Sequence, residues 1–307
     1  MAIFLGIDGG GSKTSCLIGN EQAVLGSGIA AGSNVVRVGE AEAKKAIAEV
    51  IRQACTAAKI TPSQIDRTCI GVAGAARPGV GELVRRMMTE MVSGEIQVVG
   101  DMVIAMEAAF GSGPGVIVIS GTGSIAYGRS AKGETARAGG WGFVVSDEGS
   151  GHWIGRSAVA SALRAQDEAL STTLFQAILT TWHLKTHEQL VLAANAAPPP
   201  DFAVLFPPVL SAAESGDALA VGTLNQAGIE LAELAKAVVR RIFRGAKSIP
   251  VAMSGGVFAN SALVRQVFYN RLRADCSGIA LNEAVVEPVR GALELARATH
   301  GIGRNNR

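Results

Sequence analysis

This sequence has few aromatic residues, few cysteines and almost no excess charge. Aromatic residues make up 5% of its 307 positions, while glycine occurs 38 times. This mixture is typical of an α/β enzyme with many tight turns. The net charge is +2, so the sequence predicts no basic surface for nucleic acid or for an anionic membrane. No apolar run reaches the roughly 18 residues of a membrane-spanning helix, and the apolar N-terminus lacks the basic segment of a signal peptide.

The scarce cysteines and histidines argue against certain sites. No pair has C-x-x-C spacing among the four cysteines, Cys16, Cys55, Cys69 and Cys276. We interpret them as small buried hydrophobic residues of a protein in the reducing cytoplasm. His183 and His187 could face one way on a helix, but no carboxylate motif adjoins them, so a surface position is favoured over a metal site.

A glycine-rich turn follows the first apolar strand. The chain reads as a strand from Ile3 to Asp8 and continues Gly-Gly-Gly-Ser12-Lys13-Thr14. Glycine exposes backbone N–H groups without interference from a Cβ, so such a turn can cradle phosphate oxygens. Ser12 breaks the Walker A spacing, and the residues after Thr14 read as strand, turn and strand rather than helix. The turn is therefore predicted to be the tip of a β-hairpin.

A second strand followed by a glycine-rich turn lies near residue 116. The strand Val116–Ser120 leads into Gly121-Thr122-Gly123-Ser124. This turn fits the dinucleotide pattern G-x-G-x-x-A, but a hairpin-like stretch follows it in place of a helix, and no acidic residue ends a second strand. Two such turns in matching positions suggest two homologous halves that hold one polyphosphate from both sides.

The hydrophobic pattern indicates strands and helices in alternation in both halves. In the first half we expect strands near residues 3–8, 14–19, 22–29, 67–73 and 95–99, and helices near 40–58, 79–92 and from Met102. In the second half we expect strands near 115–120, 123–129, 134–138, 249–253 and 278–282, a helical insertion at 151–217, and helices near 218–243, 260–274 and 288–299. The alternation favours mostly parallel sheets with both faces covered. The duplication predicts an N-terminal domain at 1–113 and a C-terminal domain at 114–307, with a cleft between them.

Two segments carry side chains suited to chemistry. Asp101 follows the strand Ile96–Gly100 and would face a ligand crevice there, although the same position suits an N-cap; both roles stay open. Trp141 lies between two glycines and can offer a flat apolar face to a sugar, and Asp147 can accept hydrogen bonds from hydroxyls. Structural roles are favoured for the neighbouring Glu148, His152 and Trp153, in a loop and at the start of a helix. Ser150 is expected to cap that helix, and Trp153 is expected to lie in the core.

A third segment, Ser254-Gly255-Gly256-Val257, lies between a strand and a helix. Its glycines let the backbone approach a planar ligand. Asn260 is expected to cap the helix that follows. Residues 73–78 take the same place in the first half, which again indicates a duplication.

Together these segments resemble one family. The motifs at residues 6–14, 120–124, 139–142, 146–150 and 254–257 are similar in order and spacing to those of the BadF/BadG/BcrA/BcrD ATPases. Within that family they look most like the branch of N-acetylglucosamine kinase and related amino-sugar kinases. The resemblance covers nearly the whole chain and implies the actin/hexokinase-like fold, in which two RNase H-like domains surround an ATP cleft.

The resemblance also implies roles for particular residues. Asp8 would lie by the Mg²⁺ ion on the phosphates of ATP, and Asp101 would be the base that takes the proton of the sugar hydroxyl, with O6 as the expected acceptor. The phosphates would be held by Gly10, Gly11, Ser12, Lys13, Thr14, Gly121, Thr122, Gly123 and Ser124. The adenosine would be flanked by Ser254, Gly255, Gly256 and Val257. The sugar would be contacted by Asn34, Thr122, Gly140, Trp141 and Asp147.

One departure from the family concerns the sugar. Animal N-acetylglucosamine kinases carry a serine near the acetamido group, in the loop where this chain reads Gly71 to Ala76 without serine. An amino-sugar kinase is therefore better supported than strict N-acetyl specificity, and glucosamine and N-acetylmuramic acid stay open as substrates. Relatives are often dimers, so a homodimer is the expectation.

Two other functions compete with this one. Some family members activate dehydratases or benzoyl-CoA reductase and share an iron–sulfur cluster between subunits, but no cysteine falls within residues 101–160, where a first ligand is expected. A sugar- or nucleotide-sensing regulator of related fold would need a DNA-binding module, and none is expected before the strand that begins at Ile3.

Overall fold

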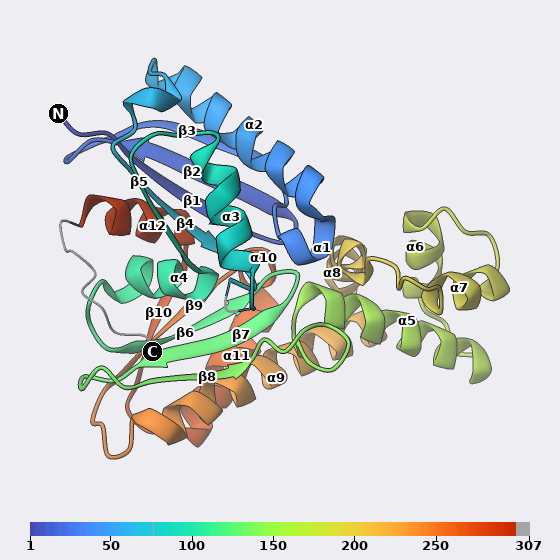
Figure 1. The fold of residues 1–307 in the computed structure, drawn as a ribbon. Coiled ribbons are helices and arrows are strands. Elements are labelled where there is room, and N and C mark those ends of the chain that lie inside the picture. Colours follow the sequence, from blue (N-terminus) through green and yellow to red (C-terminus); the bar gives the residue numbers. More distant parts are fainter. Residues whose placement is uncertain (76, 299–307) are drawn as a thin grey trace. The chain divides into compact units, whose positions relative to one another are not determined.

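The computed structural model describes residues 1–75 and 77–298, and in this part of the chain the strands form two five-stranded sheets (Figure 1). By their contacts the residues separate into two units. The first unit comprises Met1–Ser112 and the chain from Glu287 onward, and the second comprises Gly113–Val286. Each unit holds one of the sheets.

The sheet of the first unit has the strand order β3-β2-β1-β4-β5. β1 (Phe4–Gly9) pairs antiparallel with β2 (Lys13–Gly19), which pairs antiparallel with β3 (Val24–Ala31). β4 (Arg67–Val72) pairs parallel with β1, and β5 (Glu95–Gly100) pairs parallel with β4. Because tight turns join the first three strands, the sheet is mixed, and the expectation of mostly parallel sheets is wrong.

Helices cover both faces of this sheet, because successive strand residues point to opposite faces. Leu5 lies in a core cluster with side chains of α2 (Glu40–Ala58) and α3 (Val80–Thr89). The next residue toward the N-terminus, Phe4, lies in a different cluster with Ile104 of α4 (Asp101–Phe110). The predicted coverage of both faces is therefore confirmed for this unit.

The last helix joins the first unit although it follows the second unit in sequence. α12 (Pro288–Arg297) packs on β1, β4 and α4. Gly6 permits this approach, since an added Cβ would lie 2.3 Å from the backbone nitrogen of Leu293. The contact units thus differ from the predicted C-terminal domain, 114–307, at this helix, and the predicted end of the helix at Thr299 lies outside the described residues.

The second unit repeats the sheet topology of the first. β6 (Gly115–Ser120), β7 (Ser124–Arg129) and β8 (Thr135–Gly139) are joined in antiparallel order. β9 (Ile249–Ser254) and β10 (Ile279–Val286) continue the sheet in parallel from β6. The order β8-β7-β6-β9-β10 matches β3-β2-β1-β4-β5 strand by strand, which confirms the predicted duplication.

A helical segment follows β8, as predicted for residues 151–217. It consists of α5 (Gly151–Asp167), α6 (Leu174–Thr181), α7 (His187–Ala194), η2 (Phe202–Leu205) and α8 (Phe206–Glu214). α9 (Ala218–Ile242) then packs on all three antiparallel strands, with α11 (Ala262–Asp275) beside it. The predicted helix at 218–243 is also confirmed.

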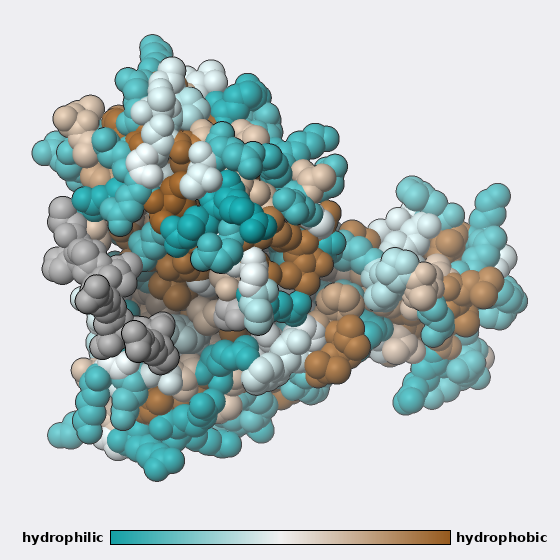
Figure 2. All heavy atoms as spheres, viewed as in Figure 1, coloured by the Kyte–Doolittle hydropathy of each residue, from teal (hydrophilic) through white to brown (hydrophobic). Residues whose placement is uncertain are grey.

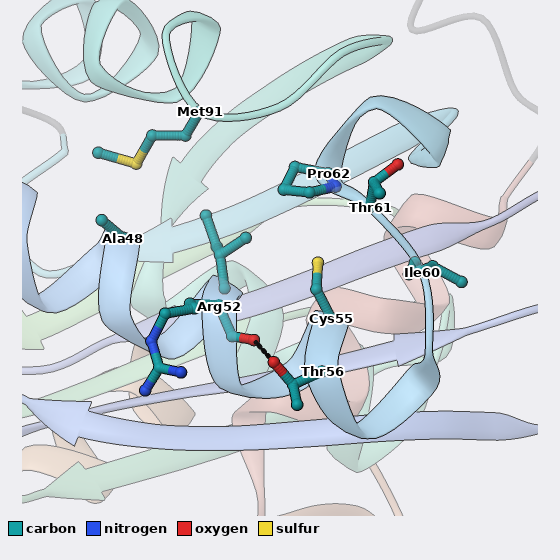
Figure 3. Close-up of a pocket in the computed structure, with 9 residues that line it drawn as sticks. Ala48, Arg52, Cys55, Thr56, Ile60, Thr61, Pro62 and Met91 are labelled. Atoms are coloured by element: carbon teal, nitrogen blue, oxygen red, sulfur yellow. Dashed lines mark hydrogen bonds between the residues drawn. The ribbon is translucent and has the colours of Figure 1, made fainter.

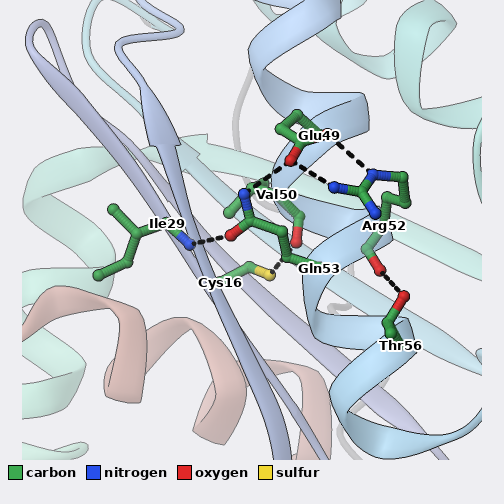
Figure 4. A network of polar contacts seen from close by, with 7 residues as sticks. All are labelled: Cys16, Ile29, Glu49, Val50, Arg52, Gln53 and Thr56. Atoms are coloured by element: carbon green, nitrogen blue, oxygen red, sulfur yellow. Dashed lines mark hydrogen bonds and ion pairs between the residues drawn. The ribbon is translucent and has the colours of Figure 1, made fainter.

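The outer strand β3 is protected by a side chain of α2 (Figure 4). Gln53 Oε1 accepts a hydrogen bond of 3.0 Å from the backbone N–H of Ile29, and Gln53 Nε2 donates to Glu49 Oε1 at 2.7 Å. Unpaired N–H groups on an edge strand invite pairing with another chain, and this contact covers one of them. On β2, the thiol of Cys16 donates to the carbonyl of Val50 at 3.1 Å, and burial raises its pKa to about 12, as expected for an inert buried cysteine.

Most of the face shown in Figure 2 is hydrophilic, and hydrophobic residues lie there in separate groups. Within the described residues, no single helix combines the length and the apolar composition of a membrane span. Only the stretch Phe202–Glu214 taken together with α9, a pair bent by 117°, meets both criteria.

The buried hydroxyl of Thr68 gives a test of the packing in the first unit. Thr68, on β4, is 2% exposed, and its Oγ1 has no hydrogen-bond partner among the described residues. Valine has the same shape without the hydroxyl, so Thr68→Val removes an uncompensated desolvation cost. We expect the free energy of unfolding to rise by about 1 kcal/mol, measured by denaturant titration.

Thr14→Val is the matched control. Its hydroxyl is also buried but donates to the carbonyl of Ala31 at 2.7 Å and lies 2.8 Å from Ser33 Oγ. Its removal leaves these partners unsatisfied and should lower stability by about 1 kcal/mol or more. Equal losses of stability in Thr68→Val and Thr14→Val would show that the Thr68 hydroxyl has a hydrogen-bond partner.

Candidate active site

Two carboxylates lie at the ends of parallel strands in the first unit. Asp8 is near the end of β1, and Asp101 directly follows β5, with β4 between these strands. Carboxyl ends of parallel strands meet at one edge of a sheet, where ligands bind in α/β folds. Gly71 of β4, opposite Asp8 in the register, leaves no room for a side chain, since an added Cβ would lie 2.3 Å from Ile104 Cδ1.

Asp101 does not cap α4. The N-cap is Gly100, and no side chain caps the helix; Asp101 Oδ1 instead accepts from the N–H of the next residue, Met102, at 2.9 Å. Of the two roles that its position left open, the capping role is therefore wrong. Its carboxylate is not needed to complete the helix, which leaves it available for chemistry.

The electrostatics of the two carboxylates are coupled. Burial and the charge of Asp101, partly offset by the charge of Lys13, raise the pKa of Asp8 to about 7, and burial is the largest cause. Burial also raises the pKa of Asp101, against the hydrogen bond from the N–H of Met102. Two carboxylates that disfavour each other's charge attract a proton or a metal cation. This edge of the sheet therefore suits proton transfer and cation binding.

The first glycine-rich turn closes the β1–β2 hairpin beside Asp8, as predicted. The N–H of Gly10 donates to the carbonyl of Lys13 at 3.0 Å, whereas the N–H of Gly11 has no partner among the described residues. The hydroxyl of Thr14 is turned inward and donates to the carbonyl of Ala31. An anion at this turn would thus meet the N–H of Gly11 and the exposed side chain of Lys13, while Thr14 holds the neighbouring strand.

Asn34 adjoins the same turn. Its backbone N–H donates to the carbonyl of Gly10 at 3.2 Å, and its Oδ1 accepts from the N–H of Val36 at the start of α1 (Val35–Val38). The Nδ2 amide has no partner within the described part of the chain. It is therefore a donor suited to a sugar hydroxyl, and Ser12 is exposed at the tip of the adjoining turn.

The second glycine-rich turn has the same construction. The N–H of Gly121 donates to the carbonyl of Gly123 at 2.9 Å, and the N–H of Gly123 has no partner among the residues that the structure describes. The hydroxyl of Ser124 is turned inward onto the carbonyl of Glu148 at 2.7 Å. The carbonyl of Thr122 accepts from the N–H of His152 at 3.3 Å, which ties the turn to the start of α5.

Asp147 packs against this second turn. It is 8% exposed and adopts a left-handed backbone with φ of 66°. An added Cβ at Gly123 would lie 2.8 Å from Asp147 Oδ2. The structure thus brings a residue predicted to bind sugar next to one predicted to bind phosphate. Ser150 caps α5 by accepting from the N–H of Trp153 at 3.2 Å, which confirms its predicted structural role.

The loop from Ser254 to Val257 lies against the end of β6. Gly255 has φ of 98°, and an added Cβ would lie 2.3 Å from the carbonyl oxygen of Ser120. Only glycine fits this approach. The hydroxyl of Ser254 donates to the carbonyl of Val286 at 3.0 Å, Val257 is buried, and the exposed Gly256 begins α10 (Gly256–Asn260).

The predicted cap at Asn260 is wrong. Asn260 ends α10, and its side chain donates back to the carbonyl of Gly256 at 2.7 Å. Ser261 caps α11 instead, since its Oγ accepts from the N–H of Val264 at 3.2 Å. Either short polar residue can serve as an N-cap. Because the extra turn α10 includes Asn260, Ser261 is the residue that directly precedes α11.

The predicted site residues form two groups, one in each unit. The first unit holds Asp8, Gly10, Gly11, Ser12, Lys13, Thr14, Asn34 and Asp101. The second unit holds Gly121, Thr122, Gly123, Ser124, Gly140, Trp141, Asp147, Ser254, Gly255, Gly256 and Val257. Sequence reasoning gave no role to Arg137, whose guanidinium lies over the ring of Trp141; a charged strand residue just before Gly-Gly-Trp was the available signal.

A cavity of about 410 Å³ lies elsewhere in the first unit (Figure 3). None of the predicted site residues lines it. Its lining comes from α2, the segment that follows it, and Met91: Ala48, Ile51, Arg52, Cys55, Thr56, Ile60, Thr61, Pro62 and Met91. The candidate site is therefore not this cavity but a set of strand ends and turn backbones.

Comparisons with known proteins find relatives that match nearly the whole chain. The model of the BadF/BadG/BcrA/BcrD ATPase family matches residues 5–296. A Clostridium acetobutylicum protein named N-acetylmuramic acid/N-acetylglucosamine kinase is 33% identical, over 97% of this chain and 99% of that protein. A Dictyostelium discoideum protein named N-acetyl-D-glucosamine kinase is 29% identical, over 96% of this chain and 97% of that protein.

A solved structure shows the same fold. A Chromobacterium violaceum protein, provisionally named N-acetylglucosamine kinase, superposes with a TM-score of 0.76 at 26% identity, over 96% of this chain and 99% of that chain. The predicted actin/hexokinase-like fold is confirmed.

The raised pKa of Asp8 predicts a pH-dependent gain of stability for Asp8→Asn. A folded-state pKa above the usual value of 3.8 means that the folded protein prefers the protonated acid. The stability that protonated Asp8 contributes is at its full value below pH 4 and is lost as the pH rises through about 7. At about 1.4 kcal/mol per pKa unit, the upper limit of this contribution to the free energy of unfolding is about 4 kcal/mol. We expect Asp8→Asn to gain about 1–2 kcal/mol at pH 8, because the side chain keeps some solvent contact.

Thermal unfolding without divalent cations, from pH 4 to pH 8, measures this gain. Asp217→Asn is the control, for which the expected change in stability has the opposite sign. Burial alone would raise the pKa of Asp217, but hydrogen bonds from Thr172, Thr173 and Ala220 lower it to about 2. Its contribution is present above pH 4 and is lost as the pH falls toward 2, so Asp217→Asn should lose stability at pH 8. A loss of stability for Asp8→Asn at pH 8 would contradict the account.

Proposed function

This chain belongs to the BadF/BadG/BcrA/BcrD ATPase family, and from that premise we propose that it is an ATP-dependent amino-sugar kinase. It transfers the γ-phosphoryl group of ATP to a hydroxyl of a hexosamine, with O6 as the acceptor and N-acetylglucosamine as the preferred sugar. The names of two relatives, N-acetylmuramic acid/N-acetylglucosamine kinase and N-acetyl-D-glucosamine kinase, support this substrate class.

The observation that carries the proposal is the placement of Asp8 and Asp101. They end two parallel strands on either side of β4, next to a glycine-rich turn and to Lys13. Phosphoryl transfer needs a group that orients and deprotonates the attacking hydroxyl, and positive charge and N–H donors around the phosphates. This edge of the sheet offers both kinds of group in one unit.

Asp101 is the general base in this proposal. Its carboxylate makes no capping bond, and its raised pKa favours acceptance of a proton from the sugar hydroxyl. The hydrogen bond from the N–H of Met102 to Oδ1 holds the carboxylate in place. As the sugar hydroxyl attacks the γ-phosphorus and passes its proton to Asp101, the bond from that phosphorus to the β–γ bridging oxygen breaks; the products are ADP, a sugar phosphomonoester and a neutral Asp101.

Each glycine-rich turn offers a backbone N–H group suited to a phosphate oxygen. Those of Gly11 and Gly123 lack partners among the described residues, and Lys13 adds a positive charge at the first turn. The loop from Ser254 to Val257 flanks the adenosine, since its glycines leave room for a planar base.

Asp8 would hold the Mg²⁺ ion that accompanies ATP. Its carboxylate oxygens are the hard donors that Mg²⁺ prefers, and this ion is typically held by one or two carboxylates together with phosphates and water. Within the described residues no cluster of three or more His, Cys, Asp or Glu side chains forms a complete metal cage, which fits an ion shared with the nucleotide. When bound, the ion offsets negative charge on the phosphates.

Each unit offers groups suited to a sugar: Asn34 in the first unit, and Thr122, Gly140, Trp141 and Asp147 in the second. Trp141 is 64% exposed and offers an apolar face, while Asp147 supplies a charged acceptor for hydroxyls. Sugars need an apolar wall and charge-assisted hydrogen bonds together. Glucosamine and N-acetylmuramic acid are the alternative substrates.

The activator function is disfavoured by the cysteines. Cys16, Cys55 and Cys69 are buried, and Cys276 is half-buried. Burial raises the pKa of the Cys69 thiol to about 12, whereas cluster ligands must be thiolates.

ADP release over a panel of sugars tests the proposal. The panel holds N-acetylglucosamine, glucosamine, N-acetylmuramic acid and glucose, each with ATP and Mg²⁺. We expect the highest kcat/KM with N-acetylglucosamine and the lowest with glucose. ADP release that no sugar stimulates would overturn the kinase proposal.

Asp101→Asn tests the general base. We expect kcat to fall by about 10²- to 10⁴-fold, with the sugar KM changed much less, because the amide keeps the shape but cannot accept the proton. Glu107→Gln, on the same helix α4, is the matched control and should keep kcat. A variant that is folded by circular dichroism and has near-normal kcat would exclude Asp101 as the base.

A further inference from the structure

Trp141 is exposed on a tight turn. Its side chain is 64% exposed, and its neighbours Gly140 and Gly142 have φ of 70° and 105°. An aromatic ring with so little packing would sample several rotamers unless a neighbour held it, and a ligand would then have to immobilise it.

The guanidinium of Arg137 provides that hold. Its Cζ lies 3.8 Å from the centroid of the Trp141 ring, well inside the roughly 6 Å range of a cation–π contact. A guanidinium is planar and weakly hydrated, so it stacks on an aromatic face better than an ammonium does. Contact on one face of the indole leaves the other face for a ligand.

Arg137 is itself fixed from two directions. Its Nη1 donates to the carbonyl of Gly139 at 3.3 Å and lies 3.5 Å from that of Gly140. Its own carbonyl accepts from Arg241 Nη1 at 2.8 Å, at the end of α9. Arg137 therefore connects strand β8 to the turn that carries Trp141.

The turn is also fixed by residues packed against it. An added Cβ at Gly139 would lie 3.1 Å from both Leu234 Cδ atoms, and one at Gly140 would lie 2.8 Å from Ile125 Cδ1. The backbone of the turn thus has little room to shift. The orientation of the indole is what remains to be set, and Arg137 is the side chain in contact with it.

We propose that Arg137 is a positioning residue for sugar binding: its guanidinium holds the indole of Trp141 so that the opposite face meets the C–H face of the sugar ring. The inference rests on the proposed kinase function. It predicts that loss of Arg137 weakens sugar binding and leaves ATP binding and kcat at saturating sugar nearly unchanged. The guanidinium contacts Trp141, Gly139 and Gly140, and none of these is assigned to the nucleotide or to the reacting atoms.

Sugar titration followed by tryptophan fluorescence, without ATP, tests this role. For Arg137→Ala we expect the Kd and KM for N-acetylglucosamine to rise by about 5- to 20-fold. Arg137→Lys should fall between wild type and Arg137→Ala, because it keeps the charge but not the planar stack. Arg129→Ala is the matched control: Arg129 lies on the adjacent strand and donates to the carbonyl of Gly113 at 2.9 Å, and its loss should leave the sugar Kd unchanged.

A double-mutant cycle separates positioning from general stability. With Trp141→Ala as background, Arg137→Ala should change the sugar KM by less than about twofold, since no ring is left to position. An additional loss as large as in the wild type would overturn the inference, as would an unchanged sugar Kd in folded Arg137→Ala and Arg137→Lys. If wild-type protein shows neither a fluorescence response nor ADP release with any amino sugar, the proposed function and this inference fall together.

Discussion

Burial of Asp8 and Asp101 at one edge of a sheet is the constraint on which the candidate site depends. Burial raises the pKa of both carboxylates, and the charge of Asp101 adds to the shift at Asp8, so that keeping both charged costs stability unless neighbouring groups or a ligand compensate. The parallel order of β1, β4 and β5 puts both acids at the same edge. Gly71 lies opposite Asp8 on the strand between them, and the charge of Lys13 on the adjoining hairpin offsets part of the negative charge.

The two glycine-rich turns show how the same local structure is built twice. In each turn an inward hydroxyl, that of Thr14 or Ser124, donates to a backbone carbonyl and fixes the turn. In each turn one glycine N–H, that of Gly11 or Gly123, has no partner within the described chain. The hydroxyls of Thr14 and Ser124 therefore fix the turns, and these backbone N–H groups offer a capacity to bind an anion.

Much of this arrangement could be predicted from local sequence. Alternating apolar residues set the strands, and glycine spacing identified both hairpin tips. Contacts distant in sequence could not be predicted in the same way. The packing of α12 on β1 depends on space above Gly6, and the choice of Ser261 over Asn260 as a cap depends on an extra helical turn. The role of Arg137 could not be predicted from the sequence, because it depends on the contact with the Trp141 side chain rather than on adjacent residues.

Phosphorus NMR of a reaction mixture tests the central claim most directly. The full chain is incubated with ATP, Mg²⁺ and N-acetylglucosamine, and the products are followed over time. The account predicts a sugar phosphomonoester signal, with the phosphate on O6, that grows at the same rate as ADP. Release of inorganic phosphate alone, at a rate that no amino sugar alters, would contradict it.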